Sequence, residues 1–219
     1  MPTNVPLSWS ENEVCDTART IIEIPVFISS PDDARDERMI LEEIIPNLNI
    51  IFSKHLGLRL DLVKWETHCT PGISTDVQSN INEQIKDDYD IFIGIMWKKF
   101  GTPTPRSGSG TIEEFERAYA RYKQDPNALR VMFYFKDTPP SSMSELDPDQ
   151  LALINEFRRK LGEKGVLYWT FKSEMEFQSL IQMHLSLRLF EWGKSWGRIA
   201  VKHTKLDDQD TTKGSPCTR

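Results

Sequence analysis

The chain is poor in the residues that build metal sites and disulfide frameworks. Its 219 residues include three cysteines and four histidines, which show no CxxC spacing and no common cluster: Cys15, Cys69, Cys217, His55, His68, His184 and His203. A protein stabilised by a structural zinc site or by a framework of disulfides is therefore not expected. The same scarcity predicts a reducing, cytoplasmic location, and it predicts neither a metal site nor a required cofactor.

Long apolar runs and an excess of positive charge are also lacking. No stretch approaches the roughly 20 apolar residues of a membrane-spanning helix, and the first residues, MPTNVPLSWSENEV, lack the basic start and apolar run of a signal peptide. The formal net charge is −6 and the isoelectric point is near 5.3. Neither a nucleic acid nor a membrane is therefore expected as a partner.

What the chain does contain is a regular alternation of strand and helix patterns. Five apolar segments read as buried strands: EIPVFISS, LRLDLVKWE, DIFIGIMW, RVMFYF and GVLYWTF. Helical periodicity follows each of them, with Pro46 predicting a kink or break in the first helix. The pattern predicts a flavodoxin-like, doubly wound α/β domain, with about five parallel strands and helices on both faces. That domain is expected over residues 21–200, between a flexible arm (1–20) and a disordered tail (201–219).

Polar and aromatic residues follow the strands of this predicted sheet. In open parallel sheets a ligand binds outside the carboxyl ends of the strands. Candidates for binding a nucleotide are therefore Ser29, Ser30, Glu66, Trp97 and Gly101. Four of them also have a structural alternative: the two serines start a turn, Glu66 forms an ion pair with Lys64 or Arg59, and Trp97 packs against a helix.

The longest of these segments is the loop WKKFGTPTPRSGSGT, residues 97–111, which leads into a helix. It has no Walker lysine and no GxGxxG directly between strand and helix. The sequence therefore gives only weak support for a P-loop ATPase or a Rossmann dehydrogenase. Backbone amides at the start of the helix can still hold an anion or a sugar hydroxyl.

Three glutamates begin the helix after this loop. At about 100° per residue, Ile112, Phe115, Tyr119 and Tyr122 form its buried stripe, Glu113 points to water, and Glu114 and Glu116 lie on opposite borders. Thr111 and Glu114 have the spacing of a capping box, with Thr111 as N-cap. Glu114 is therefore either a structural cap or a carboxylate that takes part in chemistry.

Several segments together resemble the DUF4062 family, which consists of TIR-like domains often found at the front of STAND-type signalling proteins. The resemblance rests on VFISS, KWETHCTPGI, VQSNINEQI, YDIFIGIMWKKFGTPT and SGTIEEFERAYARY, and it spans about residues 24–190. The wider TIR and nucleoside 2-deoxyribosyltransferase superfamily places a glutamate early in the helix after the third strand, and Glu114 matches that position. Gly108 and Thr111 stand where many active TIR domains have serine and cysteine.

The resemblance implies a function as well as a fold. Glu114 is expected to act on the ribose of NAD or a related nucleotide, cleaving its N-glycosidic bond in a defence or signalling pathway. Ser29, Ser30, Glu66, Trp97, Gly101 and Thr111 are expected to bind that substrate. NAD would be the substrate, and a homo-oligomer or a STAND-type protein would be the partner. The alternative is a non-catalytic nucleotide-binding or protein-interaction module that self-assembles, and a weaker one is deoxyribosyl transfer or base exchange.

Overall fold

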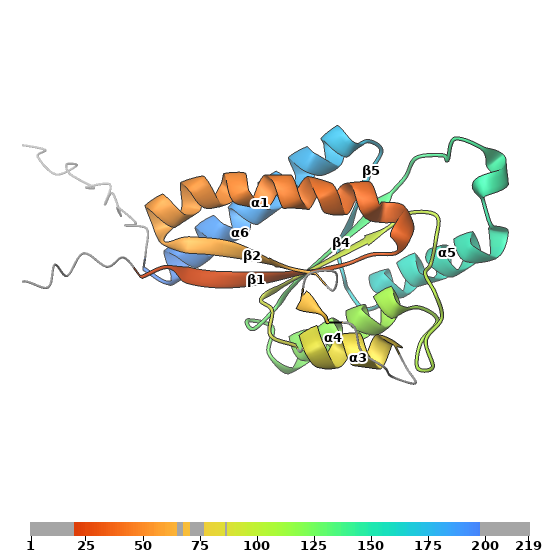
Figure 1. The fold of residues 1–219 in the computed structure, drawn as a ribbon, viewed down its shortest axis with the longest axis horizontal. Helices are drawn as coiled ribbons and strands as arrows, with labels where there is room; N and C mark the ends of the chain where they lie inside the picture. Colours follow the sequence, from red (N-terminus) through yellow and green to blue (C-terminus); the bar gives the residue numbers. More distant parts are fainter. Residues whose placement is uncertain (1–19, 65–67, 71–76, 86, 198–219) are drawn as a thin grey trace, which may run out of the picture.

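The computed structural model describes residues 20–64, 68–70, 77–85 and 87–197. The predicted N-terminal arm, except Thr20, and the predicted tail at 201–219 lie outside the described residues. The elements form the alternation that the sequence predicts, and Figure 1 shows their arrangement. In chain order they are β1 (Ile22–Ser29), η1 (Asp32–Ala34), α1 (Arg35–Leu56), β2 (Leu58–Val63), α3 (Val77–Ile85), β3 (Ile91–Met96), α4 (Gly110–Gln124), β4 (Arg130–Lys136), η2 (Met143–Glu145), α5 (Pro148–Glu163), β5 (Tyr168–Phe171) and α6 (Glu174–Ser195).

All five strands join one parallel sheet in the order β2-β1-β3-β4-β5. The predicted α/β doubly wound fold is confirmed, and this strand order is the flavodoxin-like one. The chain adds β2 on one side of β1 and then adds β3 on the other side. The order therefore reverses between β1 and β3, and the crevice at their carboxyl ends is where ligands bind in such sheets.

Helices cover both faces of the sheet, α1 and α6 on one side and α3, α4 and α5 on the other (Figure 1). The alternation along β1 explains the two cores. Ile24, Val26 and Ile28 face the α1/α6 layer, whereas Phe27 faces the layer that contains Phe115 of α4. Side chains of a strand alternate between faces, so strands covered on both faces are apolar throughout, as all six buried residues of β3 are.

The helix α1 runs without interruption through Pro46, so the predicted break is wrong. The proline ring is exposed, while Ile44, Ile45 and Leu48 of the same helix are buried in the core. The carbonyl of Glu42 that loses its i+4 donor therefore lies toward solvent, where water can bond to it. Gly57 ends the helix in the left-handed conformation, with φ of 62°.

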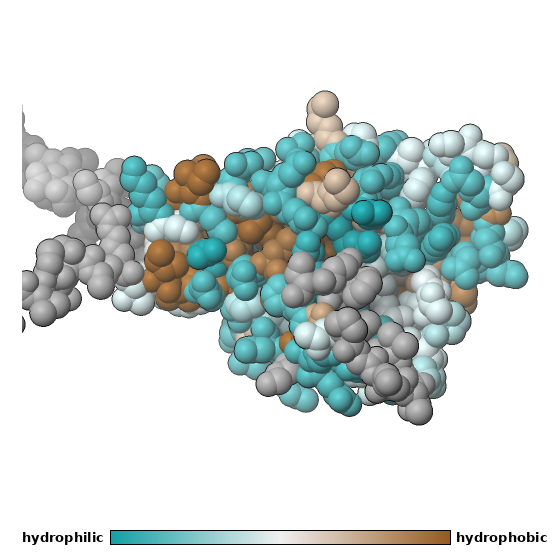
Figure 2. Space-filling view, in the orientation of Figure 1, coloured by the Kyte–Doolittle hydropathy of each residue, from teal (hydrophilic) through white to brown (hydrophobic). Residues whose placement is uncertain are grey.

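Most of the surface in Figure 2 is hydrophilic, with hydrophobic side chains gathered along β2 and the carboxyl-terminal half of α1. Ile50 and Ile51 of α1 are 72% and 54% exposed. Among the described residues, no helix has the length and hydrophobicity that crossing a bilayer requires.

Candidate functional site

A cavity of about 550 Å³ opens at the carboxyl ends of β1 and β3, where the strand order reverses. This is the position at which open α/β sheets bind ligands. Residues from both strand ends, α3, the β3–α4 loop, α4 and the start of α5 line the cavity: Ile28, Ser29, Ser30, Pro31, Asp32, Arg38, Gln78, Lys98, Lys99, Gly101, Thr102, Pro103, Gly110, Thr111, Glu114, Glu145, Asp147 and Gln150.

Glu114 is the carboxylate around which this cavity is organised. Its Oε2 accepts a hydrogen bond of 2.5 Å from Ser29 Oγ, at the end of β1. Its Oε1 accepts a bond of 2.8 Å from Gln78 Nε2, on α3. Three elements that are distant in sequence therefore hold one carboxylate in a fixed orientation. Ser29 is 1% exposed, so this support comes from inside the protein.

The capping box predicted for Thr111 and Glu114 is wrong. Ser109 is the N-cap of α4, and its Oγ accepts a bond of 3.2 Å from the amide of Ile112. Thr111 lies within the first turn and is 6% exposed. Because Ser109 already caps the helix, Glu114 does not turn back toward the helix start and instead reaches Ser29 and Gln78.

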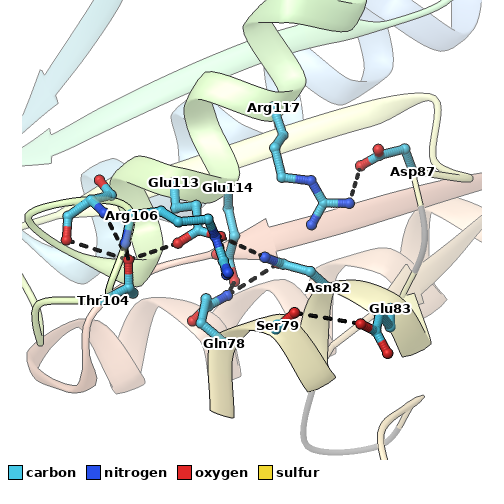
Figure 3. Close-up of polar contacts among 11 residues, drawn as sticks. Gln78, Ser79, Asn82, Glu83, Asp87, Thr104, Arg106, Glu113, Glu114 and Arg117 are labelled. Atoms are coloured by element: carbon cyan, nitrogen blue, oxygen red, sulfur yellow. Dashed lines mark hydrogen bonds and ion pairs between the residues drawn. The ribbon is translucent and has the colours of Figure 1, made fainter. Parts of the chain in front are cut away.

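Glu113 does not point to water as predicted, since it is only 7% exposed. Its carboxylate accepts bonds from Thr104 Oγ1 at 2.7 Å, Asn82 Nδ2 at 2.8 Å and Arg106 Nε at 2.8 Å, and the close-up in Figure 3 shows this network beside Glu114. Glu113 lies opposite the buried stripe of α4, but the β3–α4 loop and α3 cover this side of the helix. A helical projection contains no information about such loops.

Of the other predictions for α4, some are confirmed and one is wrong. Ile112 and Phe115 are buried as expected, and Tyr119 is half-buried. Tyr122 is 37% exposed, so the predicted stripe ends one turn early. Glu116 is exposed and pairs with Lys164 Nζ at 2.6 Å, and it does not line the cavity that contains Glu114.

Burial raises the pKa of Glu114, while the hydrogen bonds from Ser29 and Gln78 act in the opposite direction. Arg117 also lowers the pKa through its charge, and the neighbouring Glu113 raises it. The carboxylate is therefore a stronger base than an ordinary surface glutamate, yet it has fixed donors that stabilise its ionised form. A group of this kind in a cavity is a candidate functional residue.

Three cationic side chains line the cavity together with four acidic ones, Asp32, Glu114, Glu145 and Asp147. Arg38, Lys98 and Lys99 line it, and Arg38 Nη1 donates to Ser30 Oγ at 2.8 Å. Asp33 holds the loop that carries the two lysines, since its Oδ2 accepts bonds from the amides of Lys98 at 3.0 Å and Lys99 at 2.9 Å. Burial raises the pKa of Asp33, and these amide bonds oppose that rise.

Two glycines are required by the geometry of the site. Gly101 has φ of 104°, a conformation that other residues rarely adopt, and a Cβ there would lie 3.0 Å from Ser109 Cβ. A Cβ on Gly110 would lie 2.5 Å from Gln78 Oε1. The absence of a side chain at Gly110 therefore gives the Gln78 amide the space in which it reaches Glu114.

The predicted site residues are only partly brought together. Ser29, Ser30, Gly101 and Thr111 line the cavity with Glu114. Glu66 lies outside the described residues. Trp97 lines a neighbouring cavity instead, with its Nε1 donating to the carbonyl of Thr138 at 2.8 Å. The ammonium groups of Lys98 and Lys136 each lie 4.4 Å from the centre of its ring, so Trp97 already has cationic neighbours there.

Sequence reasoning missed several lining residues, above all Gln78, which sits in a polar helix with no motif around it. Arg38 is another lining residue outside any motif, and it donates hydrogen bonds to Ser30 Oγ and to the carbonyl of Pro31. In the described part of the chain, no group of three potential metal-ligating side chains comes together.

The fold and the cavity define a doubly wound α/β domain with a polar site at its topological switch point. The chain belongs to DUF4062, a family of domains of unknown function, whose sequence profile matches residues 25–186. No functionally curated protein matches it. The solved structures that are similar include the apo form of translation elongation factor SelB from Methanococcus maripaludis, with 10% identity and a TM-score of 0.43. That alignment covers 78% of this chain and 36% of the SelB chain.

Proposed function

We propose that this DUF4062 chain is a TIR-like domain that hydrolyses the N-glycosidic bond of NAD or a related nucleotide, with Glu114 as the essential carboxylate. The observation that carries the proposal is the placement of Glu114, which Ser29 and Gln78 hold at the cavity where the strand order reverses. The pathway of defence or signalling is proposed on the family resemblance alone.

The chemistry needs little beyond a fixed carboxylate. When the bond between the ribose C1′ and the nicotinamide nitrogen breaks, both bonding electrons go to the nicotinamide, which leaves as a neutral molecule. The sugar then carries oxocarbenium-like positive charge, which a nearby carboxylate stabilises. Water adds to C1′ and releases one proton, so that NAD and water give ADP-ribose, nicotinamide and H⁺.

Ser29 and Gln78 act as positioning residues in this proposal. Their hydrogen bonds to the two oxygens of Glu114 restrict its rotation, so the carboxylate does not reorganise when positive charge develops. In this proposal Ser30 and Thr111, which line the same cavity, bind ribose hydroxyls. The side chains of Arg38, Lys98 and Lys99 supply positive charge for the phosphates.

Release of nicotinamide tests the proposal directly. Concentrated protein is incubated with NAD, and nicotinamide is followed for the wild type, Glu114→Gln and the matched control Glu116→Gln. Glu116 lies on the same helix but is exposed and paired with Lys164. We expect release by the wild type and the control and none by Glu114→Gln. No release by folded, assembled wild-type protein would overturn the proposed hydrolysis.

A second candidate function, a self-assembling interaction module, is favoured by a separate observation. Exposed apolar side chains gather on the outer surfaces of α1 and α6: Ile50, Ile51, Leu187 and Phe190. Phe190 packs edge-on against Phe52 with ring centres 5.2 Å apart, which joins the two helices. Light scattering of the wild type and of Ile51→Asp tests this surface, and a strict monomer at high concentration would count against assembly.

A further inference from the structure

A second cavity of about 510 Å³ lies beside the first, at the carboxyl ends of β3 and β4. The segment between β4 and α5 forms much of its wall. Its lining combines apolar side chains with three cations: Trp97, Lys98, Lys136, Asp137, Thr138, Pro139, Pro140, Met143, Leu146, Leu151, Ile154, Asn155 and Arg158. None of the predicted site residues except Trp97 lies here.

The two cavities share one wall. Lys98 lines both of them, and its ammonium group pairs with the carboxylate of Glu145, which lines the first cavity. The start of α5 continues this wall, since Gln150 lines the first cavity and the adjacent Leu151 lines the second. The separation between the cavities therefore depends on one ion pair and one helix terminus.

The second cavity is suited to a planar heteroaromatic group. Seven of its lining residues are apolar, among them Trp97, Leu151 and Ile154. Arg158 contributes a guanidinium that lies 4.4 Å from the ring centre of Phe135. Apolar walls, aromatic rings and guanidinium planes are the groups against which bases stack.

We infer that the two cavities together bind one dinucleotide, with the ribosyl group to be cleaved at Glu114 and the distal base in the second cavity. This inference rests on the proposed function for the role of the first cavity. The pyrophosphate would lie between the cavities, where its oxygens replace the Glu145 carboxylate on Lys98. Such an exchange keeps the lysine charge paired while it opens the wall. The chain is thereby selective for dinucleotides over mononucleotides.

The test measures binding separately from cleavage. Calorimetric titrations use Glu114→Gln protein, which leaves the probes intact, with NAD and nicotinamide mononucleotide as the two ligands. We expect NAD to bind more tightly. The added variant Leu151→Trp, which fills the second cavity, should weaken NAD binding by about tenfold or more, since stacking of one base on an aromatic side chain contributes roughly 1–3 kcal/mol. It should leave binding of the mononucleotide unchanged.

Two further variants test the inference independently of Leu151→Trp, in case that variant does not fold. Arg158→Ala removes the guanidinium from the wall of the second cavity and should also weaken only NAD binding. Glu145→Gln weakens the competing ion pair and should strengthen NAD binding. Equal affinities for the two ligands, with no effect of Leu151→Trp or Arg158→Ala on NAD in folded protein, would overturn the inference. If the dinucleotide preference is found but the wild type releases no nicotinamide, hydrolysis fails while the dinucleotide site stands.

Discussion

The adjacent glutamates Glu113 and Glu114 of α4 should differ strongly in the stability that is lost on substitution. Glu113→Ala removes the acceptor for Thr104, Asn82 and Arg106. Arg106 is 47% exposed in its side chain, so water replaces much of its ion pair and that part contributes little. Thr104 and Asn82 lose a charged acceptor in a partly buried setting, which costs roughly 1–2 kcal/mol each. We expect Glu113→Ala to lower the free energy of unfolding by about 2–4 kcal/mol.

Glu114→Gln should cost far less at neutral pH. Because burial raises the pKa of Glu114 in the folded protein, its contribution to stability is fully present below the unfolded pKa and is lost as pH rises through the folded pKa. Replacing it by a neutral amide of the same shape removes that loss. The amide oxygen still accepts from Ser29, and the Gln78 amide turns over so that its oxygen accepts from the new NH₂ group. We therefore expect a change of less than about 1 kcal/mol, shifting in favour of the variant as pH rises.

Urea denaturation measures both variants against Glu116→Gln, whose carboxylate is exposed. The midpoint gives the change in stability if the slope of the transition stays constant. A loss below about 1 kcal/mol for Glu113→Ala would refute the buried network as a source of stability. A loss for Glu114→Gln as large as that of Glu113→Ala would refute the assignment of structural and chemical roles to the two carboxylates.

Three other outcomes follow from the site. Nicotinamide release should fall on the acid side with an apparent pKa above that of an ordinary glutamate, since the raised pKa of Glu114 leaves it protonated at a higher pH; a pH–rate profile with an ordinary acid limb would contradict this. Gly110→Ala should displace the Gln78 amide and lower the rate of release by about tenfold, while the urea midpoint changes little; an unaltered rate would show that Gln78 does not position Glu114. Gly101→Ala should destabilise the protein by about 1–3 kcal/mol because of its φ of 104°, and an unchanged melting temperature would contradict that strain.

The fold was predictable because each of its elements carries its own signal. Apolar runs such as DIFIGIMW identify strands that are buried on both faces, and the helices between them show periodic apolar residues. Parallel connections of this kind permit few arrangements, so the doubly wound sheet follows from local patterns. The carboxyl edge of the sheet could therefore be predicted as the place of a site, whereas the choice of β1 and β3 follows from the strand order.

Fewer details of the site could be predicted from the sequence, because they depend on side chains that approach from other elements. Gln78 is an ordinary polar residue on α3, and only the folded chain places its amide 2.8 Å from Glu114. Glu113 lies on the side of α4 that the helical periodicity predicts to be solvated, and the β3–α4 loop covers this side. Trp97 follows β3 directly, yet the chain turns so that its ring lies in the neighbouring cavity.

The N-cap at Ser109 also determines where the chain tolerates changes in length. Residues added directly before Ser109 would leave the orientation of Glu114 relative to the cap unchanged. One residue inserted between Ser109 and Glu114 would instead rotate the glutamate by about 100° relative to the cap. That rotation would move the carboxylate away from Ser29 or draw Phe115 out of the core. Natural length variation in this segment should therefore lie before Ser109, at positions that neither line the cavity nor bond to Glu113.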